Sequence, residues 1–296
     1  MLLLVLLRGE VGYRAKCPLT VHARAATRTV IGRGRKHRDR RRLEPARVCV
    51  LSLLSDLDTE CRYGAIETET AEAIKVGQSS AEIKAGFIGK VYSILAIQLL
   101  VTASGAALCM FDRAARVFVL STPAMMYLAL FAPIGLIFAL HCYKDRHPVN
   151  MYLLGAFTLC EGYTVGVICA VYYEQGAGLI VLQALLLTAA VFISLTTYVL
   201  VTRKDFSWLG AGLFTALIVL LVWGVFAQFF SFGLGGRMLF SLLGALLFSG
   251  YILYDTSNLL HRLGPDDYIV AAISLFLDII NLFLNLLQLL RGLQSN

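Results

Sequence analysis

Apolar stretches fill most of the chain after residue 87, and they restrict its fold more than any other feature. The seven stretches cover residues 88–110, 117–142, 149–172, 178–201, 208–230, 238–260 and 268–290. Each exceeds the roughly 18 apolar residues that mark a helix able to cross a bilayer. The connections between them are short. The sequence therefore predicts an all-α polytopic membrane protein, a single bundle of seven transmembrane helices within residues 87–296.

The charged residues are distributed unevenly along the chain. Residues 1–47 hold 13 Lys and Arg against 3 acids, whereas residues 87–296 hold 10 against 9. The membrane part is nearly neutral, so the net charge of +7 gives no reason to expect a nucleic-acid partner. Seven cysteines are scattered without metal-ligand spacing, which indicates neither a zinc site nor a disulfide framework.

Residues 1–86 form an amino-terminal tail of a different kind. Its segment 33–42 (RGRKHRDRRR) is a charge block that cannot bury itself, which predicts disorder. Three interpretations stay open: a cytoplasmic tail attracted to anionic lipid, an Arg-rich mitochondrial presequence, or a wrongly chosen start codon. The basic tail favours a cytoplasmic amino terminus, and seven spans then place the carboxyl terminus across the membrane.

Two aspartates, Asp255 and Asp278, lie inside the last two apolar stretches. Placing a carboxylate in hydrocarbon costs several kcal/mol of free energy. Such a residue is therefore found there mainly when it is paired or has a function. The midpoint between them falls in the turn 264–267 (GPDD), so folding this hairpin brings both to similar depth. Residues at helical spacing share a face with each aspartate: Gly244, Tyr251, Asn258 and Arg262 on the first helix, and Ser274, Asn281, Asn285 and Gln288 on the second. Both stripes should face the interior rather than lipid.

The charges inside the predicted spans are all acidic. They are Glu161, Asp255 and Asp278, with no Lys or Arg well inside any span. Two close carboxylates cannot both stay ionised in a low dielectric, so they would share a proton. When that proton leaves, the site needs a cation, and carboxylate, amide and hydroxyl oxygens suit calcium. The aspartates are therefore our candidate gate and calcium site, and the candidate ion path comprises Glu161, Tyr251, Asn258 and Asn281. A purely structural pair, joining two helices by a hydrogen bond, stays open.

Other motifs predict packing rather than chemistry. Gly162 and Gly166 form a G-x-x-x-G pattern that favours close helix contact. Tyr254-Asp255 matches the first half of the intramembrane aspartyl protease signature, but Asp278 lacks the Gly-x-Gly that the second half requires. We therefore expect that the protein is not an enzyme and that it binds no cofactor, with calcium as a permeant or bound ion.

The carboxyl-terminal hairpin, residues 249–291, resembles the signature region of the Bax-inhibitor family, the transmembrane BAX inhibitor motif proteins. Residues 90–102 (KVYSILAIQLLVT) and 147–166 resemble its lifeguard branch. The resemblance covers residues 87–291 and leaves 1–64 unmatched. It implies a seven-helix fold whose last helix is surrounded by the other six.

The same resemblance implies a function. The family is associated with calcium leak from intracellular stores and with suppression of cell death, mainly in ER and Golgi membranes. Its paired aspartates match Asp255 and Asp278 and are held to gate the pore by shared protonation. A basic latch near the end of the second span would fall on Lys144 or Arg146.

Three functions therefore compete. The first is a pH-sensitive calcium leak channel in contact with lipid, calcium and protons. The second is a membrane adaptor that regulates cell death through protein partners without conducting ions. The third, a proton-coupled carrier, is disfavoured because the chain shows no obvious two-half repeat. For location we expect the ER or Golgi membrane, with the mitochondrial inner membrane as the alternative.

Overall fold

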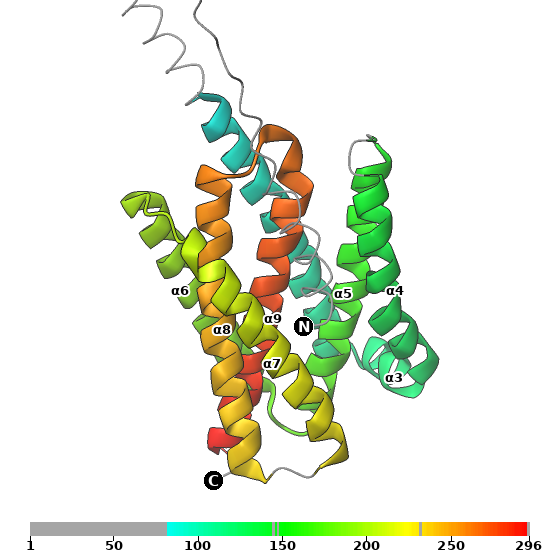
Figure 1. Ribbon diagram of the computed structural model, residues 1–296. Coiled ribbons are helices and arrows are strands. Elements are labelled where there is room, and N and C mark those ends of the chain that lie inside the picture. Colours follow the sequence, from blue (N-terminus) through cyan, green and yellow to red (C-terminus); the bar gives the residue numbers. More distant parts are fainter. Residues whose placement is uncertain (1–81, 144–145, 147, 231–232, 295–296) are drawn as a thin grey trace, which may run out of the picture. The chain divides into compact units, whose positions relative to one another are not determined.

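A computed structural model describes residues 82–143, 146, 148–230 and 233–294, and residues 84–294 belong to one compact unit (Figure 1). The predicted tail therefore lies outside the described residues up to residue 81, and Glu82 already begins a helix. All regular structure in the described part of the chain is helical.

The helices follow one another with short connections. They are the Glu82–Phe111 helix, α3 (Arg113–Ser121), α4 (Pro123–Cys142), α5 (Val149–Glu174), α6 (Gly178–Thr202), η1 (Ser207–Leu209), α7 (Gly210–Phe229), α8 (Leu234–His261), η2 (Pro265–Asp267) and α9 (Tyr268–Gln294). Six of the helical segments are long and apolar enough to cross a membrane. The chain is thus an all-α polytopic membrane protein, as expected. Its seventh span stays a prediction, because the stretch that qualifies within α4, Phe131–Leu140, is shorter.

The prediction of one continuous helix over residues 117–142 is wrong. The structure has two helices there, α3 and α4, separated at Thr122 and Pro123. Proline lacks an N–H and disfavours the α conformation of the residue before it, and Thr122 accordingly has φ −119° and ψ 73°. Pro123 instead opens α4 at its first turn, where a missing N–H costs nothing.

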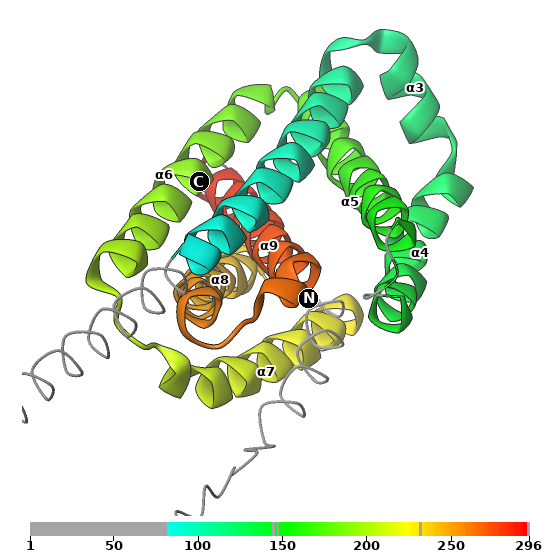
Figure 2. The same cartoon turned by 90° about the horizontal axis from the view of Figure 1, so that it is seen from above.

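The last helix lies in the middle of the others, as the resemblance implied. Seen from above, α9 is enclosed by the Glu82–Phe111 helix, α5, α6, α7 and α8 (Figure 2). It packs extensively against α8, and also against α6. Phe276 meets Phe157 of α5 edge to face, and Lys90 Nζ lies 3.6 Å from the centroid of the Tyr268 ring. The apolar residues of α9 are therefore buried on nearly every side of the helix.

The outer helices present apolar side chains at the surface instead. Leu100, Leu186 and Phe229 are 67%, 63% and 80% exposed, respectively. In a soluble protein such a surface would aggregate, but on membrane helices it is the face that lipid covers. The bundle is thus closely packed within, mainly by apolar side chains, and apolar on its outer face as well.

The G-x-x-x-G pattern on α5 makes the close contact that the sequence predicted. A Cβ at Gly162 would lie 3.5 Å from Cα of Thr102, and one at Gly166 would lie 3.0 Å from Sγ of Cys109. One turn earlier, Gln98 Nε2 donates to Thr158 Oγ1 at 3.1 Å. The small residues therefore let α5 lie directly against the Glu82–Phe111 helix.

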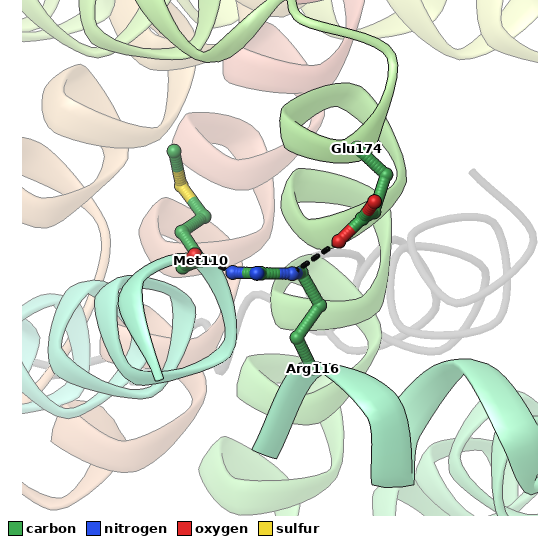
Figure 3. Close-up of polar contacts among 3 residues, drawn as sticks. All are labelled: Met110, Arg116 and Glu174. Atoms are coloured by element: carbon green, nitrogen blue, oxygen red, sulfur yellow. Dashed lines mark hydrogen bonds and ion pairs between the residues drawn. The ribbon is translucent and has the colours of Figure 1, made fainter. Parts of the chain in front are cut away.

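An arginine connects three helices at the far end of that interface. Arg116 of α3 donates through Nη1 to the carbonyl of Met110 and through Nε to Oε1 of Glu174 (Figure 3). Its guanidinium also lies 4.9 Å from the centroid of the Tyr173 ring. Asp112 caps α3 by accepting from the Ala115 N–H at 2.9 Å. The short helix α3 is therefore fixed at Arg116 and at its N-cap residue, Asp112.

Candidate functional site

The two intramembrane aspartates lie on two helices that pack extensively against each other, α8 and α9. The predicted turn joins them: α8 ends at His261, and the Gly264 N–H donates to Oδ2 of Asp267 at 3.2 Å. By chain position Asp255 lies six residues before the end of α8, and Asp278 ten residues after the start of α9. At 1.5 Å per residue these are depths of about 9 and 15 Å along the helices.

The aspartates differ in exposure. Asp278 is 0% exposed, at the centre of the central helix. Asp255 is partly exposed. Burying a carboxyl group completely is costly unless it is neutralised or paired. That the two carboxyls share a proton stays a prediction.

The polar stripe of α9 alternates between accessible and enclosed positions. Ser274, Asn281 and Gln288 are partly exposed, whereas Asp278 and Asn285 are buried. Two side-chain amides of this stripe bond to the backbone of their own helix. Asn285 Nδ2 donates to the Asn281 carbonyl, and Asn281 Nδ2 donates to the Leu277 carbonyl, each at 2.7 Å. Both amides thereby direct their N–H groups into the helix backbone, which fixes the side chains along the helix.

The stripe of α8 meets that of α9 at a glycine. A Cβ at Gly244 would lie 2.1 Å from Oδ1 of Asn285, so the Asn285 amide occupies the space that glycine leaves. Further along α8, Tyr251 is 1% exposed, and its ring lies 6.3 Å from that of Phe248. Asn258 Oδ1 is buried and has no hydrogen-bond partner among the described residues. An acceptor oxygen therefore lies one turn from Asp255 with its lone pairs unused.

The third acid lies apart on α5. Glu161 is 8% exposed, beside the contact of Gly162 with Thr102. The flanking hydroxyls of Thr158 and Thr164 donate to the carbonyls of Leu154 and Cys160 in their own helix. Glu161 thus lies inside the bundle, and its place near an ion path stays a prediction.

The candidate latch falls on the connection between α4 and α5. Lys144 lies outside the described residues. Arg146 is exposed, and its guanidinium lies 5.7 Å from the centroid of the Tyr143 ring. A latch at either position stays a prediction. Among the described residues, no three His, Cys, Asp or Glu side chains gather into a metal site. Calcium would therefore depend on two carboxylates with amide oxygens.

Sequence reasoning missed a polar contact close to Asp255. The connection between α6 and η1 binds Ser257, whose Oγ accepts from the Phe206 N–H at 2.9 Å. Hydrogen bonds from Ser207 to the Asp205 carboxylate hold the pKa of Asp205 below its usual range. The nearby charges of Arg262 and His261 lower this pKa further. Asp205 therefore stays ionised until the pH falls below that range. A serine within an apolar helix gave no signal of this contact, because its partners lie more than fifty residues away.

Comparison with known proteins gives concordant matches. A family described as "Inhibitor of apoptosis-promoting Bax1" matches residues 84–296. The "Golgi anti-apoptotic protein" of vaccinia virus (strain Lister) is 41% identical over 240 residues, covering 81% of this chain and 95% of the viral protein. "Protein lifeguard 4" of Mus musculus is 42% identical over 242 residues, covering 82% of this chain and 100% of the mouse protein. "Protein LIFEGUARD 2" of Arabidopsis thaliana is 43% identical over 222 residues, 73% and 91% of the two chains.

Proposed function

The chain belongs to the Bax inhibitor family, and from this membership we propose that it regulates cell death by letting calcium leak across an intracellular membrane. The gate is the pair Asp255 and Asp278. The observation that carries the proposal is the complete burial of Asp278 at the centre of the central helix. Such a carboxyl group is expensive in a membrane bundle and usually marks a path for ions or protons.

The distribution of charge supports a cation path. Glu161, Asp255 and Asp278 are acids within the described membrane helices. The Lys and Arg of the same part of the chain lie near helix ends or in connections, except Lys90, which is exposed and lies against the Tyr268 ring. An interior that carries only acids favours cations over anions. The unpartnered Oδ1 of Asn258 adds a neutral oxygen ligand of the kind calcium accepts.

The exposure pattern of α9 supports a gate at Asp278. The stripe is accessible at Ser274 on one side of this residue and at Asn281 on the other, and it is closed at Asp278 and again at Asn285. With one shared proton the two aspartates attract each other and keep the helices together. Loss of this proton leaves two negative charges that repel each other and bind a cation. Raising the pH should therefore open the path.

Calcium flux into liposomes that contain the purified chain tests this mechanism. We expect Asp278→Asn to change the leak rate several-fold and to flatten its pH dependence, because an amide cannot release the shared proton. Asp112→Asn is the matched control, since it removes a charge at the α3 cap and asparagine caps helices equally well. An Asp278→Asn protein with the rate and pH dependence of the wild type would refute the gate.

The adaptor hypothesis predicts a different result in cells. Under it, cells expressing Asp278→Asn survive a death stimulus as well as those expressing the wild type, although the leak is altered. A parallel loss of leak and protection instead supports conduction as the cause of protection.

We place the protein in endomembranes, with the Golgi favoured because the viral relative is named a Golgi protein. Imaging of the full-length tagged chain against Golgi, ER and mitochondrial markers tests this location. Signal confined to mitochondria would support the presequence interpretation of the tail instead.

A further inference from the structure

The short helix α3 lies where its neighbouring helices end. Its Arg116 donates to the carbonyl of Met110, in the last turn of the Glu82–Phe111 helix, and to Glu174, the last residue of α5. Asp112, which caps α3, is exposed directly after the first of these two helices. Charged groups gather where membrane helices leave the hydrocarbon and reach the lipid headgroups. These contacts therefore place α3 at one boundary of the membrane.

The length of α4 means that α3 is not needed for a membrane crossing. The 20 residues of α4 extend about 30 Å, which is the thickness of the hydrocarbon core. The 9 residues of α3 extend only about 14 Å, and the break at Thr122 and Pro123 separates them from α4. Figure 1 shows α3 beside the start of α4, and Figure 2 shows it outside the ring of the other helices. The helix is thus free to follow the membrane boundary instead of crossing it.

The outward side of α3 is apolar. Val117 and Phe118 are both more than half exposed. Val119 is instead buried, in a cluster that includes Val167 of α5. Phe111, at the end of the preceding membrane helix, is also more than half exposed, so the apolar surface of α3 continues the lipid-facing surface of the bundle. This continuity indicates that lipid covers α3 as it covers the outer helices.

The charge of α3 also fits a phospholipid. Arg113 is exposed at the start of the helix, whereas Arg116 is bonded to protein groups. An arginine at this depth lays its apolar stem along hydrocarbon and brings its guanidinium to the headgroup phosphates. We propose that α3 lies along the membrane surface and that phospholipid covers its outward side. The proposal does not depend on calcium conduction, because none of the three intramembrane acids takes part.

The depths of two tryptophans test the direction of α3. Ala114 and Ser121 are exposed and lie two helical turns apart on the same face. Ala114→Trp and Ser121→Trp are each made in a chain that carries Trp208→Phe and Trp223→Phe. Liposomes contain phosphatidylcholine with bromine, which quenches tryptophan fluorescence, either near the headgroup or near the ends of the acyl chains. We expect both tryptophans to be quenched mainly by the shallow bromine and to the same extent.

A helix directed across the membrane predicts a different result, because the two tryptophans would then differ in depth by about 10 Å. Such a difference would overturn the proposal. Val219→Trp in the same background is the reference for a deep site, since Val219 is more than half exposed and lies midway along α7. A depth for α3 equal to that of Val219→Trp would also contradict the proposal. So would an absence of quenching on α3 while Val219→Trp is quenched, because water or another protein would then cover the helix.

A second measurement leaves both native tryptophans in place. Phe118 is replaced by benzoylphenylalanine, which bonds to nearby C–H groups under ultraviolet light, and the chain is irradiated in phosphatidylcholine nanodiscs. Mass spectrometry should find an adduct heavier by one phospholipid. The same replacement at Phe229, which is exposed on the lipid-facing surface, is the positive reference. A lipid adduct at Phe229 with none at Phe118, or a crosslink between two copies of the chain at Phe118, would show that lipid does not cover α3.

Discussion

Replacing Gly244 by alanine is expected to destabilise the bundle by about 3 kcal/mol, the upper end of the usual cost of overpacking a core. The first added atom, Cβ, would lie 2.1 Å from Oδ1 and 2.5 Å from Cγ of Asn285. Asn285 has little freedom to move, because it is 7% exposed and its Nδ2 donates to the Asn281 carbonyl. The two helices that carry the aspartates must therefore separate, and thermal unfolding in detergent measures the loss.

Two further variants show whether the contact is responsible. Gly155→Ala is the control, since a Cβ there meets nothing within 4 Å. Asn285→Ala removes every atom that the new Cβ would strike, so it should restore part of the stability lost in Gly244→Ala. If Gly244→Ala unfolds at the temperature of the wild type, the close approach of α8 and α9 at this point is wrong.

Replacing Arg116 by alanine should cost about 2 kcal/mol. The change removes the donor to the partly buried Met110 carbonyl, the ion pair with Glu174 and the contact with the Tyr173 ring together. Lysine should recover little, because an ammonium group cannot reproduce the forked donors of a guanidinium. The same unfolding assay measures both variants.

Glu174→Gln separates the parts of this contact. The side chain of Glu174 is 53% exposed, so water screens its ion pair and the loss should be at most about 0.5 kcal/mol. From the most to the least stable, the expected order of the variants is therefore Glu174→Gln, Arg116→Lys and Arg116→Ala. A loss for Glu174→Gln as large as that for Arg116→Ala would show that the ion pair, rather than the Met110 carbonyl, fixes α3.

Hydropathy predicted most of the architecture because the length of an apolar run measures whether a helix can cross the bilayer. It failed at Pro123, since a window of average hydropathy ignores where the backbone can remain helical. The hairpin of α8 and α9 was predictable for a local reason, the Gly-Pro turn between two long helices. The contact at Gly162 and Gly166 was predictable because small residues at this spacing have one common use in membranes.

The polar contacts between distant segments were not predictable. Arg116 and Glu174 are 58 positions apart, and Phe206 and Ser257 are 51 apart. For the candidate site, the sequence identified Asp255, Asp278 and Glu161 because acids are rare in apolar helices. It could not indicate that Asp278 is enclosed while Ser274 and Asn281 on the same stripe remain accessible.

The central position of α9 has a consequence for biosynthesis. This helix follows all the other described helices in the chain, yet the Glu82–Phe111 helix, α5, α6, α7 and α8 enclose it (Figure 2). During translation the earlier helices must enter the bilayer as an incomplete ring, and Phe157 cannot meet Phe276 until residues 268–294 have left the ribosome. A chain stalled before that point would expose its interior to lipid and to the proteases of membrane quality control. The cellular yield of this protein should therefore depend strongly on the completion of its final helix.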